Sequence, residues 1–279
     1  MKVGRIPYIN CYPVYGAIDR GIVSLAAELV DGVPTALNRQ MASGALDVSV
    51  VSAVEYARNA DRYLLVPNLA ISCDGPVRSV ALFSKRPASE LDGRPVIVSR
   101  SSMTSAALVE LLFEHVWHAQ PHFVPGDAEL SDLLDLDRDP HDARLVIGDA
   151  ALLLTARREA HERMSYPYVY DLGAEWKAWT GLPFVFAVWA AQRTSARDQA
   201  LAACAALRAS RDWGLDHLPD LARQAADVTG VAAATCLDYL SGLDYGLSYA
   251  HLAGLIEFLR RLVVAGRVPD GSLAFLPAA

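Results

Sequence analysis

Short hydrophobic segments alternate with segments of helical periodicity through the first two thirds of the chain. The segments whose composition predicts strands are 2–8, 47–51, 63–66, 79–84, 95–98, 144–147, 168–171 and 184–189. Candidate helices lie between them. Strands that alternate with helices are typical of βαβ units, so we expect an α/β protein in which the sheets are mostly parallel and flanked by helices.

The clearest predicted helix covers residues 104–118. Leu108, Leu111, Leu112 and Val116 fall on one face of it, and Pro121 ends the segment. From residue 195 to residue 266 the pattern is helical only, which predicts a helical C-terminal tail packed back on the α/β part.

Two capping signals mark helices of this tail. Ser195-x-x-Asp198 has the form of a capping box, and Ser248 is placed to cap the last helix. One apolar stripe of that last helix is expected to face the core, and it consists of Leu252, Leu255, Ile256, Leu259, Leu262 and Val263.

At about 150 residues per domain, a length of 279 residues favours two domains. The alternating pattern is interrupted at 85–95 and again at 181–188, and both interruptions resemble crossovers between two lobes. We therefore expect one lobe made of residues 1–85 plus 186–279, which includes the helical tail, and a second lobe made of residues 86–185. The cleft between two such lobes is the default place for a ligand.

Composition narrows the possible partners. Hydrophobic residues make up 53% of the chain, so a large core is available, and the net charge of −7 argues against nucleic acid. The longest apolar run, 182–191, is too short to span a bilayer, so no membrane partner is expected. The first residues do not have the form of an export signal, and the four cysteines are widely separated. These features favour a cytoplasmic protein with reduced thiols.

Motifs that bind a nucleotide or carry a serine nucleophile do not occur in the sequence. Neither a GxGxxG fingerprint after a strand, nor a Walker-type phosphate loop, nor a GxSxG nucleophile elbow is present. His115, His118 and His122 lie close together, but Pro121 takes His122 off the helix, so a solvated helix end is favoured over a metal site. We expect neither a cofactor nor a metal.

Small polar residues follow several predicted strands. Ser102, Thr104 and Ser105 open the strongest helix, where hydroxyls and free backbone N–H groups can bind a carboxylate or simply cap the helix. Ser52 follows the strand 47–51 in the same way. The pair Gly148-Asp149 follows the strand 144–147. Each could be a plain helix cap, but open α/β sheets bind ligands at these strand ends.

The segment 6–13 is the most unusual one, because two prolines bracket a polar pair. Asn10 offers a hydrogen-bond donor and an acceptor in a rigid place, although a turn residue or helix cap is the simpler interpretation. Cys11 is more readily a small apolar filler than a nucleophile. Further on, Trp176 and Trp179 could form the wall of a site for a ring-shaped ligand, but packing in the core is the slightly favoured interpretation.

Taken together, these segments resemble the chorismate dehydratases of the futalosine route to menaquinone. The resemblance covers nearly the whole chain, and the motifs that carry it are RIPYINCYP (5–13), DVSVVSAVEY (47–56), GPVRSV (75–80), Ser102-x-Thr104-Ser105, IGDA (147–150), DLG (171–173) and WTGLPF (179–184). It implies the two-lobed fold of type II periplasmic binding proteins.

The resemblance also implies an activity and roles for residues. The activity is a cofactor-independent lyase that removes water from chorismate to give 3-[(1-carboxyvinyl)oxy]benzoate. The proposed catalytic Asn of the family falls on Asn10, and its cleft Ser falls on Ser79. The helix start at Ser102, Thr104 and Ser105 matches a substrate-carboxylate site. The cleft is also expected to contain Ser52, Gly148 and Asp149. An Asp that faces a dianion is unfavourable, so the role of Asp149 could be limited to supporting the cleft.

Two alternatives of different kinds remain at this point. A small-molecule solute-binding protein has the same fold and cleft, but it would need export or a lipid anchor. The sister enzyme 1,4-dihydroxy-6-naphthoate synthase resembles this chain as well. Its relatives carry a Ser-Pro-Cys-Pro-Asn pattern at the first strand end and use a cleft His. Here the strand end is PYINCYP (7–13), and no His lies in a cleft motif, so this alternative is the less favoured one.

Overall fold

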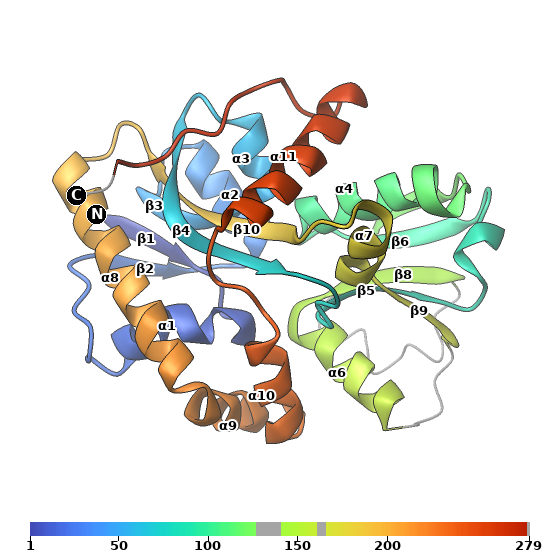
Figure 1. Cartoon of the computed structure of the whole chain (residues 1–279), viewed down its shortest axis with the longest axis horizontal. Helices are drawn as coiled ribbons and strands as arrows, with labels where there is room; N and C mark the ends of the chain where they lie inside the picture. The colour runs from blue at the N-terminus through green and yellow to red at the C-terminus, as the bar shows by residue number, and fades with distance from the viewer. Residues whose placement is uncertain (127–140, 161–165, 278–279) are drawn as a thin grey trace.

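The computed structural model describes residues 1–126, 141–160 and 166–277, which form two lobes, each around a five-stranded sheet (Figure 1). The first sheet has the strand order β2-β1-β3-β10-β4. Its strands are β1 (Lys2–Arg5), β2 (Glu28–Asp31), β3 (Val48–Ser52), β4 (Tyr63–Cys73) and β10 (Phe184–Gln192). The fully buried pattern of β3 reflects helices or chain on both faces of the sheet.

The second sheet has the strand order β7-β6-β8-β5-β9. Its strands are β5 (Val80–Ser84), β6 (Pro95–Ser99), β7 (His122–Gly126), β8 (Ala143–Ile147) and β9 (Tyr168–Asp171). The sequence pattern predicted eight of the ten strands and missed β2 and β7. Both are short edge strands without a fully buried residue, so their hydrophobic signal is weak.

In each sheet a single strand runs against the others. β10 pairs antiparallel with both β3 and β4, and β5 pairs antiparallel with both β8 and β9. Each of these reversed strands is the first one after the chain enters a lobe from the other lobe. The sheets are therefore mixed: most strands share one direction, as expected, and the entering strand is reversed because it starts at the edge where its neighbours end.

The first crossover lies earlier than the sequence placed it. Val80–Ser84 pairs within the second sheet, so the chain leaves the first lobe after Cys73 and not within 85–95. The second passage, between α7 (Leu172–Thr180) and β10, lies within the predicted 181–188 segment. On this pairing we propose lobe boundaries at these two passages in place of residues 85 and 186.

Helices cover the faces of both sheets (Figure 1). In chain order the remaining helices are α1 (Tyr12–Asp19), α2 (Pro34–Ala42), α3 (Ala53–Arg58), α4 (Met103–Leu112), α6 (Gly148–Glu159), α8 (Arg197–Asp216), α9 (Leu218–Thr229), α10 (Ala233–Ser241) and α11 (Tyr249–Val264). Short 3₁₀ turns lie at Ile9–Cys11 and Ala88–Glu90. The helix predicted over 104–118 is α4 followed by a π-helical turn, Phe113–Trp117.

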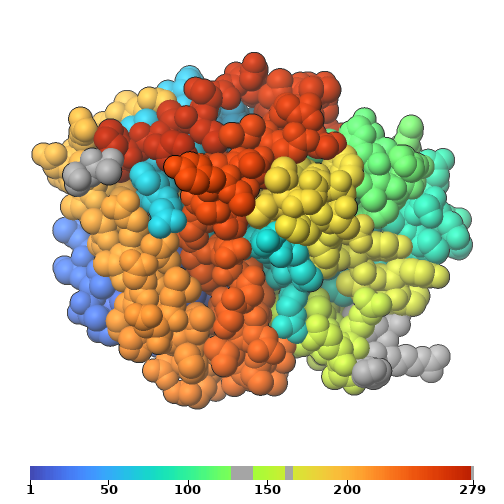
Figure 2. Space-filling view, in the orientation of Figure 1, coloured from blue at the N-terminus to red at the C-terminus, as the bar shows by residue number. Residues whose placement is uncertain are grey.

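The tail helices α8 to α11 pack on the first lobe, and α11 also reaches α7 of the second lobe (Figure 2). The Arg261 guanidinium of α11 lies 3.8 Å from the centre of the Trp179 ring. Trp176 is fully buried and donates its ring N–H to the Pro183 carbonyl at 3.1 Å. Trp176 therefore belongs to the core, as the sequence favoured, and not to a ligand wall.

One of the two predicted helix caps is correct. Ser248 accepts from the His251 backbone N–H and begins α11 in a capping box. Ser195 caps nothing, because α8 begins one residue after Ala196 and the Ser195 hydroxyl donates to Asp47 at 2.8 Å. The predicted α11 stripe is also incomplete: Leu255 and Leu262 are buried, but Ile256 is 53% exposed.

No helix within the three described stretches has both the length and the apolar character that crossing a membrane requires. Most of the hydrophobic core forms one large cluster that continues from the first lobe into the second, and a smaller cluster lies within the second lobe.

Candidate active site

A narrow cavity of about 70 Å³ lies between the lobes, at the edge where strands of both sheets end. Hydrophobic residues of both lobes, including Ile71, Ile147 and Phe186, form much of its wall. The structure brings six of the eight predicted site residues together there, and these are Asn10, Ser52, Ser79, Ser102, Ser105 and Gly148. Thr104 and Asp149 do not line it.

Asn10 lies in the 3₁₀ turn between β1 and α1, and Pro13 lies in the first turn of α1, which begins at Tyr12. Its side-chain Oδ1 is buried and has no hydrogen-bond partner among the described residues. An unpaired buried carbonyl is unfavourable by about 1–3 kcal/mol, so such an oxygen on a residue that lines a cavity indicates a place for a ligand. Asn10 is no helix cap, because α1 begins after Cys11 without a side-chain cap.

Cys11 also lines the cavity, but its thiol is not a candidate nucleophile. Complete burial raises the pKa of the Cys11 thiol far above its ordinary value, and the negative charge of Asp149 raises it further. The thiol therefore stays protonated, which supports the interpretation of Cys11 as an apolar filler.

Ser79 reaches the cavity from the crossover into the second lobe. Its carbonyl accepts from the Gly148 N–H at 2.7 Å, and its N–H donates to the Val77 carbonyl at 2.7 Å. The phenol of Tyr239, on α10, lies beside the Ser79 side chain: burial raises the pKa of this phenol, and Ser79 lowers it. The sequence did not identify Tyr239, because an aromatic residue on a tail helix has the same pattern as a core residue.

Ser102 and Ser105 lie at the start of α4 and are joined by their hydroxyls, 2.8 Å apart. Ser102 also accepts from the Ser105 N–H at 3.2 Å, so it is the helix cap and a cavity residue at once. Thr104 is buried behind them, where its hydroxyl accepts from the Val54 N–H at 3.4 Å. Thr104 thus joins α4 to α3, while the two serines face the cavity.

Ser52 caps α3 by accepting from the Glu55 N–H at 3.0 Å. A second contact comes from Asn38 on α2, whose amide donates to the Ser52 hydroxyl at 3.2 Å and accepts from the Ser52 N–H at 3.2 Å. Because Ser52 already has these partners, its place in the cavity wall is firmly fixed. Asn38 was not identified from the sequence, since no helix was assigned around it.

Gly148 has φ +68°, and an added Cβ would lie 3.1 Å from the Tyr8 ring. A glycine is therefore required there by both conformation and space. The next residue, Asp149, accepts from the Ile9 N–H at 3.2 Å and connects α6 of the second lobe to the turn that carries Asn10. Burial raises the pKa of Asp149 to about 6.

This pKa predicts how Asp149 affects stability with pH. The folded-state pKa of about 6 lies above the ordinary 3.8, so the folded protein binds the proton more tightly and loses stability as pH rises through this interval. Asp149→Asn keeps an oxygen for the Ile9 N–H without the charge. We expect its melting temperature to exceed that of the wild type above pH 6 and to match it near pH 4.

Thermal unfolding of both proteins at several pH values measures this difference. A difference in melting temperature that stays constant from pH 4 to pH 7.5 would mean that the Asp149 carboxyl is not the group that titrates.

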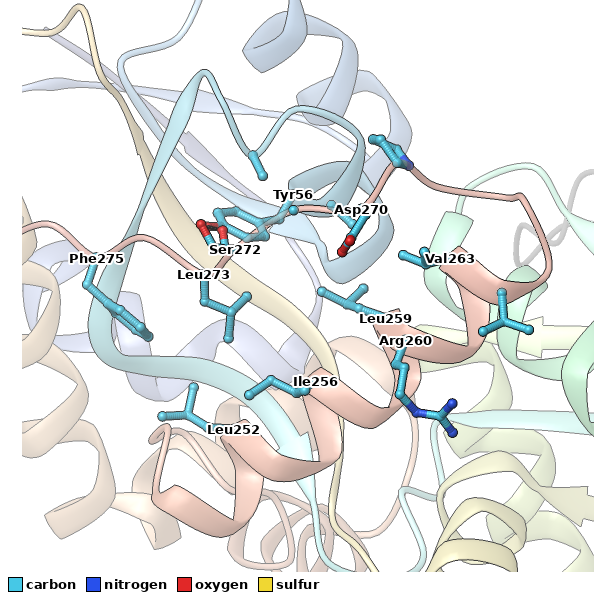
Figure 3. Close-up of a pocket in the computed structure, with 15 residues that line it drawn as sticks. Tyr56, Leu252, Ile256, Leu259, Arg260, Val263, Asp270, Ser272, Leu273 and Phe275 are labelled. Carbon is cyan, nitrogen blue, oxygen red and sulfur yellow. Dashed lines mark hydrogen bonds between the residues drawn. The ribbon is translucent and has the colours of Figure 1, made fainter.

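A larger pocket, of about 630 Å³, lies elsewhere, between α11, the C-terminal segment around Leu273 and the end of α3 (Figure 3). Its lining is almost entirely apolar, and its charged residues are Arg260 and Asp270. The Arg260 guanidinium is already bonded to Glu257 at 2.8 and 2.9 Å. Convergent polar groups are found in the cavity between the lobes instead, which makes the smaller cavity the candidate active site.

The fold defines a general class of protein. A protein of Archaeoglobus fulgidus superposes with a TM-score of 0.76 at 19% identity, over 96% of this chain and 98% of the other. The alkanesulfonate-binding protein of Xanthomonas axonopodis pv. citri, solved with bound MOPS, superposes with a TM-score of 0.65 at 13% identity, over 98% and 96% of the two chains. The chain therefore has the periplasmic-binding-protein fold, as the sequence predicted.

Residues 1–263 match a family described as menaquinone biosynthesis, and the chain belongs to this family. A chorismate dehydratase of Thermus thermophilus is 33% identical over 243 residues, which are 84% of this chain and 86% of that protein. A chorismate dehydratase of Campylobacter jejuni is 28% identical over 67% of this chain and 66% of its own length. The family inferred from the sequence motifs is thus confirmed.

Proposed function

We propose that the protein removes water from chorismate to give 3-[(1-carboxyvinyl)oxy]benzoate, in the futalosine route to menaquinone. The observation that carries this proposal is the convergence of Asn10, Ser79 and the start of α4 in one cavity between the lobes of a chain of this family. The chorismate dehydratases that it resembles support the substrate. Neither a solute-binding protein nor the sister naphthoate synthase is favoured by these relatives.

The reaction breaks a ring C–H bond and a C–OH bond and leaves an aromatic ring. Aromatisation supplies the driving force, so the protein's task is to orient the substrate and to manage the proton. An amide such as that of Asn10 is a poor base. In this proposal its N–H₂ group donates to the departing hydroxyl, and the carboxylate of the substrate's own side chain accepts the ring proton. The departing hydroxide takes up this proton, so that water leaves and the carboxylate is restored. The unpaired Oδ1 of Asn10 takes a hydrogen bond from the substrate.

The start of α4 is assigned a substrate carboxylate. Ser102 and Ser105 expose hydroxyls there, and the first N–H groups of a ten-residue helix carry partial positive charge. Ser79, just before β5, is assigned a second hydrogen bond to the substrate, which orients the ring for the reaction. An acidic protein can bind a dianion in this way because the local groups, and not the net charge, set the field.

The cavity is much smaller than the roughly 300–1000 Å³ that small-molecule sites commonly offer. We therefore propose that the lobes separate to admit the substrate and approach each other around it. In this arrangement Asp149 and Ile9 form one of the contacts between lobes that opening breaks.

The central experiment is incubation with chorismate in the presence of a metal chelator. We expect the absorbance of chorismate to fall and one molecule of the aromatic product to appear for each molecule consumed. Binding without conversion would favour the solute-binding alternative. Activity that requires an added metal or coenzyme would contradict the cofactor-independent part of the proposal.

We also propose a cytoplasmic location, which cell fractionation tests.

Ser105→Ala is expected to weaken binding more than catalysis. A hydrogen bond to a charged group contributes about 1.5–3 kcal/mol, so KM should rise roughly tenfold to a hundredfold while kcat changes little. Thr104→Val is the matched control, because Thr104 lies next in sequence but outside the cavity. It should affect the melting temperature and leave KM unchanged.

Steady-state kinetics of the two variants give the answer. If Ser105→Ala has the KM of the wild type, its hydroxyl serves only the helix start, and the carboxylate must be bound elsewhere.

A further inference from the structure

The crossover that carries Ser79 is fastened to the start of α7. The Asp171 carboxylate accepts from the Val77 N–H at 3.0 Å through Oδ1 and from the Arg78 N–H at 2.6 Å through Oδ2. Its Oδ1 also accepts from the Ala174 N–H at 3.0 Å, which is the cap of α7. Helix capping alone needs only this third bond, so the other two serve the crossover segment.

The crossover has an unusual backbone at the residue before Ser79. Arg78 has φ +61°, a left-handed conformation that a residue with a long side chain seldom adopts. Such a conformation persists only where the surroundings hold it. The Asp171 carboxylate holds the Arg78 N–H, and the Thr155 hydroxyl of α6 donates to the Arg78 carbonyl at 3.1 Å.

Close packing supports the same attachment. An added Cβ at Gly173 would lie 2.5 Å from the Gly75 carbonyl oxygen and 2.6 Å from the Cys73 sulfur, so the first turn of α7 contacts the crossover backbone directly. Further along α7, Lys177 forms an ion pair with Asp74 at 2.5 Å. The segment 73–79 is therefore held along its length by one side of α7.

We propose that Asp171 is a positioning residue, which fixes the strained turn at Arg78 and thereby directs the Ser79 hydroxyl toward the substrate. The proposal rests on the proposed function, because it assigns Asp171 a role in the same reaction. Asp171 does not touch the cavity, so it acts only through Ser79. Its loss should lower kcat and leave KM nearly unchanged, since the carboxylate site at α4 is untouched.

Asp171→Asn is the informative variant. An asparagine has one acceptor oxygen in place of two, so it can keep the cap of α7 but cannot hold both N–H groups of the crossover as well. We expect kcat to fall about tenfold, because a displaced group loses most of its contribution. Ser248→Ala, which removes the cap of α11 away from the cavity, is the control for a lost cap and should keep normal kinetics.

A double-mutant cycle separates positioning from general damage. In a Ser79→Ala background, Asp171→Asn should cause no further loss of kcat, because the hydroxyl that it directs is already gone. An equal loss in both backgrounds, or a normal kcat in Asp171→Asn alone, would overturn the proposal.

Hydrogen exchange of the peptide 75–80, followed by mass spectrometry, gives a readout that needs no substrate. It should be faster in Asp171→Asn than in the wild type and unchanged in Ser248→Ala. If the wild type fails to convert chorismate, the proposed function fails, while faster exchange would still show that Asp171 holds the segment. Unchanged exchange would overturn the positioning role in either case.

Discussion

Replacing Asn10 with alanine is expected to lower the turnover of chorismate by about 100- to 1000-fold while leaving the free energy of unfolding unchanged or slightly higher. The first effect follows from the loss of a donor aimed at the departing hydroxyl. The second follows from the unpaired Oδ1, which is unfavourable for the folded state by about 1–3 kcal/mol. A side chain that lines a cavity although it is unfavourable for the folded state is best explained by a role in binding the substrate.

Steady-state kinetics and thermal unfolding of Asn10→Ala measure both effects. Asn10→Asp tests the charge, because a carboxylate beside a dianionic substrate should be at least as harmful as alanine. Asn59→Ala is a suitable control, since Asn59 lies outside the cavity at the end of α3 and bonds to Glu55. Near-normal turnover in both Asn10 variants would remove this residue from the mechanism.

Gly214→Ala is expected to destabilise the protein by about 1–3 kcal/mol, although alanine usually favours a helix over glycine by about 1 kcal/mol. Gly214 lies on α8 where this helix crosses α1. An added Cβ would meet the backbone of Pro13 and lie 2.7 Å from its carbonyl carbon. A backbone neighbour cannot rotate away, so the two helices must separate.

The same change should reduce turnover, because Pro13 lies in the first turn of the helix that follows the Asn10 turn. Denaturant unfolding and chorismate turnover measure the two effects. Gly271→Ala is the control: its added Cβ would make an ordinary contact at 3.6 Å with Ala60, so both quantities should stay normal. An unchanged free energy of unfolding in Gly214→Ala would mean that the α1–α8 contact yields easily.

The sequence predicted the strands best where hydrophobic residues are buried on both faces. It could not reveal that β5 and β10 run against their neighbours, because strand direction depends on where the other lobe returns the chain. For the same reason it placed the first crossover at 85–95, where prolines interrupt the pattern, and not at the segment before Ser79. The signal at Ser195 was local and correct in form, but α8 begins only after Ala196 and the Ser195 hydroxyl bonds to Asp47.

The candidate site was predicted well at the ends of strands, since polar residues there converge in any fold of this kind. The six predicted residues that line the cavity came from that rule or from the family motifs. The sequence did not assign a role to residues that contact the site residues from outside the cavity. Asn38 bonds to Ser52, Tyr239 lies beside Ser79, and Asp171 holds the turn at Arg78 that precedes Ser79. An Asp at a strand end with Gly two positions later was visible as a motif, but only the fold shows which distant N–H groups it holds.

The position of β10 has a consequence for how the chain becomes native. β10 lies between β3 and β4, so these two strands have no neighbour to join them until residues 184–192 exist. The strands of the second sheet, in contrast, come from the continuous stretch 80–171. During synthesis the second lobe can therefore complete its sheet first. Until residues 184–192 are made, β3 and β4 each have an edge with no strand to pair with. The part of the chain that is made first is the last to be finished.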